Sequence, residues 1–436
     1  MLFFAVYFFQ RRKGRVRLKK YIITTLILLL LIAGVVGMVL LRSGEGTPAQ
    51  AAEFTPAPCT HETWADGACE SCALRCVHRA WEEGLCTRCG WGCPHEQWLP
   101  NACARCGIAC PHDVYDRDKH GCLRCGVELS HRYAGYRCEI CDEPLEFETG
   151  YLPWELFAGS DRPGTVETLT YETDDYYLLS IGMESNASWE KAMCVYLPYG
   201  YDPARQYDVL VLLHGMGGTE EYWLLGRQEY YGPGTDKVRT KELLDNMIAQ
   251  GLCKEMIVVT PCFYQVPAER KIYDRMIDQA RFAGELQNII LPMIAETYST
   301  YAADGSREAL SAAREHFAFA GLSMGSIYGY NAVLPQCVDL FAWYGLFAGA
   351  ECHTGKVAEA LNAPENADHP IAFLYNAAGT NDSMALPHQG QYNEILSMTP
   401  GLTEGENAAF TWIEDAYHEY RAWGTGLYNF LRIAFH

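Results

Sequence analysis

The C-terminal two thirds of the chain alternate short apolar runs with patterns of helical spacing. Continuous apolar runs, which are typical of strands buried on both faces of a sheet, occur at residues 207–213, 256–261, 318–320 and 370–375, and residues 410–415 read as a final strand and its exit. Residues 285–298 instead place hydrophobic side chains along one face of a helix. Residues 164–181 and 190–197 alternate as strands at a sheet edge do. This alternation of strands and helices predicts an α/β fold with a mostly parallel sheet flanked by helices.

The start of the chain has a different pattern, in which residues 21–41 carry no charge. As a helix this run is long enough to cross the hydrocarbon core of a membrane, which takes ~20 residues. Seven Lys or Arg residues lie within residues 11–20, and only Arg42 follows closely. The positive-inside rule therefore predicts a cytoplasmic segment at 1–20, a single transmembrane helix at 21–41, and an extracellular C-terminal bulk. The small residues at 49–51 leave open a cleaved signal peptide, although the apolar run exceeds the usual signal core of about 7–15 residues.

Residues 42–57 are small, polar and proline-containing, as linkers are, and a cysteine repeat follows at 58–142. Each complete copy begins with C-x-H and ends with C-x-x-C, and its first cysteine recurs every 17 residues from Cys59 to Cys110. A fifth copy has Leu129 where the first cysteine would stand. The candidate metal ligands are Cys59, His61, Cys69, Cys72, Cys76, His78, Cys86, Cys89, Cys93, His95, Cys103, Cys106, Cys110, His112, Cys122, Cys125, His131, Cys138 and Cys141.

Three thiolates and one imidazole in each complete copy match the ligands of a closed tetrahedral zinc site. Disulfides are the alternative, which an extracellular location favours, but they leave the histidine of every copy unexplained. Closed zinc sites are structural, so we expect a spacer or docking element, for which the sequence specifies no partner. The repeats resemble the short zinc-ribbon-like repeats found in tandem on bacterial surface proteins. The Gly/Pro-punctuated residues 143–163 predict a second linker, and residues 164–436 the catalytic domain.

The chemistry of this domain is indicated by the G-x-S-x-G motif at residues 321–325, which follows an apolar strand and precedes a helical pattern. A serine at such a turn, here Ser323, has strained backbone and an exposed hydroxyl. Asp382 follows the apolar run at 370–375, where it occupies the acid position, although it could instead cap the next helix. His418 follows the last run, where a general base must lie to reach the serine. The order Ser, Asp, His predicts a catalytic triad.

A glycine-rich loop at 214–218 follows the apolar run at 207–213. Such a loop can offer a backbone N–H to an oxyanion, and the residue after the nucleophile, Met324, can offer a second. Tyr222 and Trp223 follow this loop, and their rings could stack on a sugar or an aromatic acid. The triad chemistry requires no cofactor.

Charge narrows the choice of partners. The chain of 436 residues is 49% hydrophobic and has a net charge of −20. The first 42 residues hold eight positive charges and no Asp or Glu, so the remainder carries −28. A surface this acidic repels nucleic acid and anionic lipid, so we expect no nucleic-acid partner.

Several segments together resemble the esterase D-like α/β-hydrolases, and in particular carbohydrate esterase family 1, which contains feruloyl and acetylxylan esterases. The similar segments, within residues 165–436, are 196–201, 212–223, 321–325, 418–423 and 427–431. The resemblance implies Ser323 as nucleophile, Asp382 as acid, His418 as base, and Met216 with Met324 as oxyanion donors. The sequence departs from the family at Ser326, where a second glycine is usual, and at Tyr417 and Tyr420, where glycine and tryptophan are common.

These patterns together predict a membrane-anchored, extracytoplasmic serine esterase that cleaves feruloyl, acetyl or similar esters on carbohydrate, or small acyl esters, through an acyl-enzyme. Acyl transfer to a cell-envelope sugar is an alternative within the same fold, and the sequence does not separate it from hydrolysis. A second alternative is an inert hydrolase domain that serves in surface binding or adhesion.

Overall fold

The structure is a computed structural model, and it describes part of the chain. The chain forms two compact units, Met1–Pro94 and His95–His436. The described residues are 64–65, 68–69, 81–83, 85–87, 98–99, 102–103, 108–112, 114–116, 121–131, 133–174, 188–226, 238–265 and 277–436. The predicted segments 1–20, 21–41 and 42–57 lie outside them, as do the candidate ligands Cys59, His61, Cys72, Cys76, His78, Cys89, Cys93, His95 and Cys106. Within the described ranges, no helix combines the length and apolar character needed to cross a membrane.

Every copy of the cysteine repeat contains a hairpin of two very short antiparallel strands. In the first unit, β1 (Trp64–Ala65) pairs with β2 (Ala68–Cys69), and β3 (Trp81–Glu82) with β4 (Leu85–Cys86). In the second unit, the pairs are β5 (Trp98–Leu99) with β6 (Ala102–Cys103), β7 (Tyr115–Asp116) with β8 (Gly121–Cys122), and β9 (Tyr133–Ala134) with β10 (Arg137–Cys138). In all five the register places an aromatic residue opposite the first cysteine of C-x-x-C. The sequence repeat is therefore a repeated hairpin.

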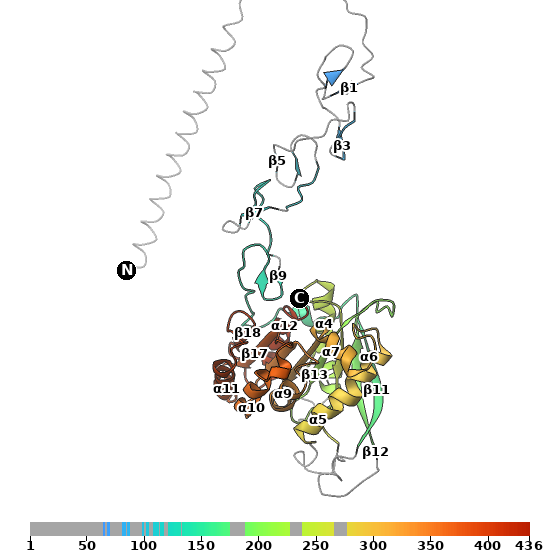
Figure 1. Ribbon diagram of the computed structural model, residues 1–436, viewed down its shortest axis with the longest axis vertical. Helices are drawn as coiled ribbons and strands as arrows, with labels where there is room; N and C mark the ends of the chain where they lie inside the picture. The colour runs from blue at the N-terminus through green and yellow to red at the C-terminus, as the bar shows by residue number, and fades with distance from the viewer. Residues whose placement is uncertain are drawn as a thin grey trace, which may run out of the picture. The chain divides into compact units, whose positions relative to one another are not determined.

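The second unit also contains an eight-stranded sheet in the order β11-β12-β14-β13-β15-β16-β17-β18 (Figure 1). Its strands are β11 (Thr165–Asp174), β12 (Ser188–Leu197), β13 (Asp208–Leu213), β14 (Met256–Thr260), β15 (Phe317–Leu322), β16 (Trp343–Phe347), β17 (Phe373–Gly379) and β18 (Ala408–Ile413). β11 and β12 are antiparallel, and the pairs from β14 to β18 are parallel. The predicted α/β fold with a mostly parallel sheet is thus confirmed, and the structure adds an antiparallel edge.

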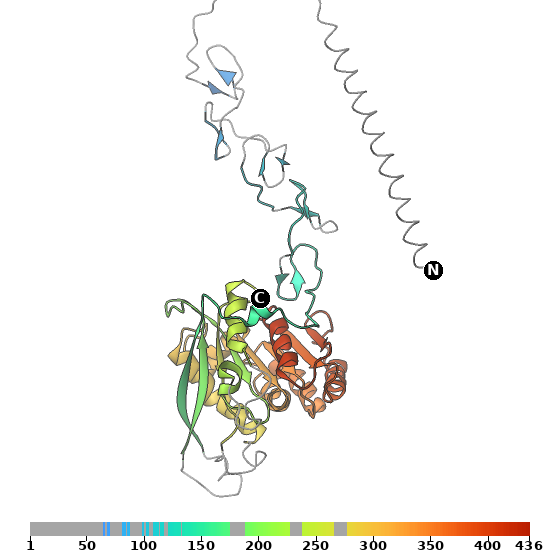
Figure 2. The same ribbon diagram turned by 180° about the vertical axis from the view of Figure 1, so that it is seen from behind.

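Helices cover both faces of this sheet (Figures 1 and 2). Side chains of β13 alternate between two cores: Val209 and Val211 face one, while Leu210 and Leu212 face the other. The first core is closed by α5 (Gln279–Glu285), η3 (Leu286–Ile290), α6 (Leu291–Thr297), α7 (Arg307–Ala312), α8 (Met324–Tyr328), η5 (Gly329–Val333), α9 (Leu334–Gln336), α10 (Thr354–Leu361) and α11 (Ala385–Met398). The second is closed by η1 (Trp154–Phe157), α3 (Glu221–Leu225), α4 (Thr240–Ala249) and α12 (Tyr420–Leu431). Two short 3-10 turns, η4 (Arg314–His316) and η6 (Pro364–Asn366), are the remaining helical elements of the described residues. The predicted apolar face at 285–298 is confirmed, since Leu286, Ile290 and Ile294 are fully buried.

The segment predicted as a linker at 143–163 differs from expectation because it packs onto the α/β domain. Leu145 and Leu156 are buried in the second core. The side-chain amide of Asn429, in α12, donates to the carbonyl of Glu148 across 2.8 Å and accepts from its N–H across 2.9 Å. Apart from the short 3-10 helix η1, the described segment forms no helix or strand, but its backbone hydrogen bonds and isolated leucines still pack it onto the domain.

The fifth cysteine repeat contacts the same domain directly. Tyr136 packs against Phe373, the first residue of β17, with ring centroids 5.2 Å apart. The guanidinium of Arg137 donates to the carbonyl of Gly405, just before β18, across 2.7 Å. Both contacts lie where strands begin, at the amino edge of the sheet.

Candidate active site

The predicted nucleophile lies at a sharp turn between β15 and α8. Ser323 has φ 47° and ψ −116°, a strained conformation that few side chains adopt. A Cβ added at Gly325 would lie 2.5 Å from the carbonyl oxygen of His214, and one at Gly321 would lie 2.6 Å from the carbonyl carbon of Gly325. The chain crosses itself so closely here that both motif glycines are required.

The three predicted triad side chains meet at the carboxyl edge of the sheet. His418 Nε2 lies 2.9 Å from Ser323 Oγ, and its Nδ1 lies 2.7 Å from Asp382 Oδ2. The other oxygen, Asp382 Oδ1, accepts the N–H of Met384 across 2.8 Å. The carboxylate is fully buried, whereas the imidazole is 37% exposed. With its Nδ1 proton donated to Asp382, His418 presents Nε2 as an acceptor for the serine proton.

Two residues near His418 bear on its orientation and on the choice of its acid partner: Trp423 and Asp415. Trp423, in α12, packs edge-on against His418 with ring centroids 5.1 Å apart. Asp415 is exposed at a left-handed turn with φ 55°, and its N–H donates to Thr380 Oγ1 across 2.9 Å. The described hydrogen bonds of the His418 ring go to Ser323 and Asp382, so Asp415 does not hold the imidazole.

The glycine-rich loop lies beside the nucleophile, as expected for an oxyanion-binding loop. A Cβ added at Gly215 would lie 3.2 Å from Ser323 Cβ. Among the described residues, no acceptor takes the N–H of Met216 or of Met324. The next amide, that of Gly217, is instead occupied by the hydroxyl of Tyr264 at 2.8 Å. The amides of Met216 and Met324 are therefore available to a developing oxyanion.

His214 gives the loop its shape. Its Nδ1–H donates to the carbonyl of Gly215 across 2.7 Å, and its ring stacks on Phe263 with centroids 4.2 Å apart. Complete burial lowers its pKa to about 3, so the ring is neutral at physiological pH. A neutral, enclosed imidazole positions the loop and exchanges no proton with substrate.

The departures from the resembled family are accommodated by packing. Ser326 is fully buried against Gly349, where an added Cβ would lie 2.4 Å from the serine Cβ. Tyr420 is buried with its hydroxyl 3.1 Å from Thr240 Oγ1, while Tyr417 is exposed. The sequence around Gly349 does not indicate this contact, because Gly349 reaches the turn that carries Ser323 and Ser326 only when β16 lies beside β15.

The expected stacking role of Tyr222 and Trp223 is wrong for these side chains as the structure places them. Trp223 is fully enclosed, and its indole N–H donates to the carbonyl of Leu213 across 3.1 Å. Tyr222 is buried in the same core. The position of an aromatic residue after a glycine-rich loop does not indicate whether its side chain is buried. Here both side chains are buried, and they hold α3 against the domain core.

The fourth cysteine repeat gathers its four predicted ligands. The ligand atoms of Cys110, His112, Cys122 and Cys125 all lie within 4.8 Å of one another. The Sγ atoms of Cys110 and Cys122 are 3.6 Å apart, far beyond a disulfide of about 2.05 Å but near the ~3.8 Å between two corners of a zinc–thiolate tetrahedron. His112 Nε2 is buried with no hydrogen-bond partner among the described residues, as a metal-ligating atom would be. The donor set fits zinc.

The fifth repeat gathers three ligands. His131, Cys138 and Cys141 form a second group, in which His131 Nδ1 lies 3.5 Å from Cys141 Sγ. Gly126 and Asp142, one residue after the C-x-x-C of the fourth and fifth repeats, share left-handed φ values of 71° and 65°. Their N–H groups donate to the carbonyls of Cys122 and Cys138 across 2.8 and 2.9 Å. The two repeats thus share one turn around their sulfurs.

Comparisons with known proteins agree with this fold. No family model matches the chain. Among curated proteins, endo-1,4-beta-xylanase Y of Acetivibrio thermocellus is 29% identical over 219 residues, which is 48% of this chain, and the chain spans 18% of the length of that relative. Among solved structures, a feruloyl esterase module from Clostridium thermocellum, complexed with sinapinate, is 23% identical, with a TM-score of 0.54 over 67% of this chain and 96% of that one. A CE1 ferulic acid esterase from the anaerobic fungus Anaeromyces mucronatus is 23% identical, with a TM-score of 0.50 over 67% and 98%.

The sheet order and these likenesses define the class of this domain: it has the α/β-hydrolase fold. Within that fold, the serine, histidine and aspartate lie at strand ends in hydrogen-bonding order.

Proposed function

We propose that this chain is a serine esterase that hydrolyses acyl esters of the feruloyl, acetyl or similar type on carbohydrate. The observation that carries the proposal is the continuous hydrogen-bonded line from Ser323 Oγ through His418 to Asp382, with distances of 2.9 and 2.7 Å. The similarity to proteins named as feruloyl and ferulic acid esterases, and to one named as a xylanase, supports an ester on a plant polysaccharide as substrate.

In the proposed mechanism, Ser323 Oγ attacks the ester carbonyl while His418 Nε2 takes the hydroxyl proton. The oxyanion accepts from the amides of Met216 and Met324. When the ester C–O bond breaks, His418 returns the proton to the departing sugar oxygen, which leaves the acyl group on Ser323. Water then attacks this acyl-enzyme, passes a proton to His418, and releases the acid as the proton returns to Oγ. Asp382 holds the imidazolium in orientation throughout.

In the same proposal, the cysteine repeats are structural zinc sites, and residues 21–41 anchor the enzyme so that it acts outside the cell. Cys110, His112, Cys122 and Cys125 would hold one metal ion. A closed four-ligand site supplies folding free energy and takes no part in ester cleavage.

The test is hydrolysis of feruloylated, acetylated and short-chain aryl esters by the full chain. Ser323→Ala and His418→Ala should each lower turnover by roughly 10⁶-fold, and the double variant should lose little more, because triad residues act as a unit. Mass analysis should locate the trapped acyl group on Ser323. Turnover that survives Ser323→Ala would refute the mechanism, and inactivity of the unsubstituted chain toward the whole panel would favour the inert-domain alternative.

A further inference from the structure

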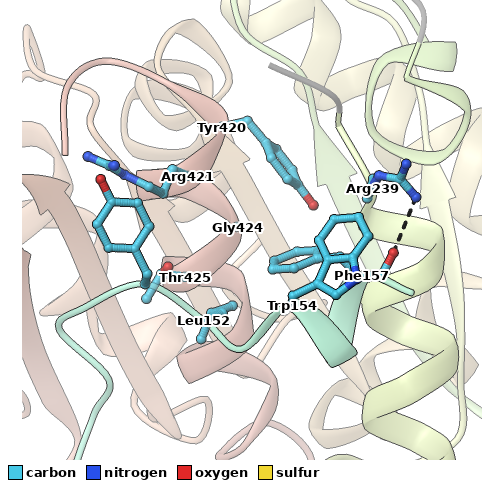
Figure 3. Close-up of a pocket in the computed structure, with 9 residues that line it drawn as sticks. Leu152, Trp154, Phe157, Arg239, Tyr420, Arg421, Gly424 and Thr425 are labelled. Atoms are coloured by element: carbon cyan, nitrogen blue, oxygen red, sulfur yellow. Dashed lines mark hydrogen bonds between the residues drawn. The ribbon is translucent and has the colours of Figure 1, made fainter. Parts of the chain in front are cut away.

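A cavity lies beside the start of α12. Its volume is about 460 Å³, within the usual range of ligand pockets. The lining residues come from the segment before the sheet, from the start of α4 and from the start of α12 (Figure 3): Tyr151, Leu152, Trp154, Phe157, Arg239, Tyr420, Arg421, Gly424 and Thr425. The catalytic mechanism uses none of them.

The cavity presents aromatic rings that the fold leaves uncovered. Tyr151 is 66% exposed and Trp154 is 62% exposed, although both belong to a segment that is otherwise packed onto the domain. Figure 3 shows the indole of Trp154 in front of Phe157, on the opposite side of the cavity from Arg421. Flat aromatic faces at the rim of a pocket suit the C–H face of a sugar ring, which packs on them without losing its hydroxyl hydration.

Two guanidinium groups border the same space. Arg421 stacks 3.9 Å from the ring centroid of Tyr151, and Arg239 lies 5.2 Å from that of Trp154. Arg239 donates to the carbonyl of Phe157 across 3.2 Å and lies 3.7 Å from Glu242, while Arg421 lies 3.2 Å from Glu419 and donates to the carbonyl of Asp415. Each guanidinium has five N–H donors, so these contacts leave donors for a ligand. The residues that line the cavity include these two arginines and no Asp or Glu, so the charge that a ligand meets first is positive, although the chain beyond residue 42 carries −28.

The cavity adjoins the triad through one helix. Tyr420 and Arg421 begin α12, two and three residues after His418, and Trp423 of the same helix packs against the His418 ring. A polymer bound in the cavity would therefore contact the helix whose Trp423 packs on His418.

The geometry points to a subsite for acidic polysaccharide: a uronic acid unit of the substrate, with its ring on Trp154 and its carboxylate on Arg239, across the cavity from Arg421 (Figure 3). This inference rests on the proposed esterase function and names its substrate class. A guanidinium group matches a carboxylate in shape and charge, whereas a neutral sugar would leave Arg239 without a ligand partner.

The experiment measures binding without catalysis. The full chain with Ser323→Ala is titrated calorimetrically with a xylo-oligosaccharide that bears glucuronate, with the same oligosaccharide after reduction of its carboxyl group to an alcohol, and with free ferulate. We expect the acidic oligosaccharide to bind at least roughly tenfold more tightly than the reduced one, and only its binding to weaken as salt rises.

Variants assign this binding to the cavity. Trp154→Ala should weaken it by roughly tenfold, Trp154→Phe should retain it, and Arg239→Gln should equalise the acidic and reduced ligands. Tyr199→Ala and Arg205→Gln are the matched controls, since Tyr199 is 56% exposed and Arg205 is exposed and paired with Glu255, both outside the cavity. Trp154 is exposed, so its removal spares the core.

Three results would each overturn the inference. They are equal affinity for the acidic and the reduced oligosaccharide, binding of the acidic oligosaccharide that survives Trp154→Ala, and binding of ferulate with no binding of the acidic oligosaccharide. The proposed function fails separately: a Ser323→Ala chain that binds the acidic sugar, together with an unsubstituted chain that cleaves no ester, would refute the esterase and leave the subsite. Active ester cleavage without acidic-sugar binding would remove only the subsite.

Discussion

The imidazole of His418 donates to the buried carboxylate of Asp382 across 2.7 Å, although the two residues are 36 positions apart and follow different strands. This relationship separates Asp382 from Asp415, which is only three residues from the histidine in sequence.

Asp382→Asn should lower turnover by roughly 10⁴-fold, because an amide spoils the tautomer and orientation of His418 without removing nucleophile or base. Asp415→Asn is the matched control and should have little effect, since Asp415 is exposed and asparagine tolerates its left-handed φ of 55°. Steady-state hydrolysis of an activated aryl ester measures both. Loss of turnover in Asp415→Asn with retention in Asp382→Asn would reassign the acid.

The contact between Gly349 and Ser326 predicts a compensating pair. Gly349→Ala should destabilise the protein by about 1–3 kcal/mol, because its Cβ would lie 2.4 Å from Ser326 Cβ and 2.7 Å from the carbonyl of Ser323. Adding Ser326→Gly should restore part of the loss by removing the side-chain clash. Urea unfolding of the single and double variants measures the coupling. Strictly additive effects would show that the two residues do not press on each other.

Two enclosed histidines predict a loss of stability in acid. Burial lowers the pKa of His214 and of His388 to about 3, against about 6.5 in an unfolded chain. Below pH ~6.5 the unfolded chain binds more protons, so the stability is fully present above that pH and is lost as the pH falls toward 3. Each histidine should account for about 2 kcal/mol between pH 7 and pH 5.

Urea unfolding at pH 7 and pH 5 checks this expectation. His388→Gln should reduce the pH-dependent loss, because it removes one of the two titrating imidazoles. The variant should still fold, because a glutamine can donate toward Asn376 Oδ1, which accepts from His388 Nε2 at 2.9 Å. The exposed His353, changed to glutamine, serves as control. An unchanged pH dependence in His388→Gln would contradict the prediction.

The four complete cysteine repeats predict about four zinc ions per chain, with a fifth only if another group replaces the thiolate absent at Leu129. Cys122→Ser should reduce bound zinc by about one, as measured by elemental analysis of the full chain. Cys352→Ser, in the hydrolase domain, is the matched control. A metal-free chain whose repeats unfold only after a reductant is added would establish disulfides in place of zinc.

The basic residues before position 21 predict that residues 43–436 lie outside the membrane. Protease added to intact cells should therefore digest the hydrolase domain, and a cytoplasmic marker protein in the same cells should survive. Protection of the hydrolase domain until the cells are lysed would reverse the orientation.

The elements that the sequence predicted well are those with strong local patterns. The apolar run at 207–213 and the helical spacing at 285–298 became β13 and the α5–α6 region because burial alone determines them. The triad residues could be chosen because each follows such a run, and parallel strands end at one edge of the sheet. The structure then brings Ser323, Asp382 and His418 into hydrogen-bonding distance.

The elements that sequence reasoning missed depend on contacts between distant segments. Trp223 follows the oxyanion loop in sequence, but its ring turns into the core. The segment 143–163 has a linker's composition, yet Asn429 in the last helix holds it by two backbone hydrogen bonds. The cavity at Trp154 joins three separate parts of the chain, so no local pattern could have indicated it.

The contacts of the fifth repeat at Phe373 and Gly405 determine how the domain would bear a mechanical load. A force transmitted along the repeats enters the sheet where its strands begin. Ser323 and Asp382 follow the opposite ends of those strands, outside the path of that force. If the chain is anchored as proposed, tension along the repeats would act on the amino edge of the sheet, whereas the hydrogen bonds that join Ser323, His418 and Asp382 lie at the other edge.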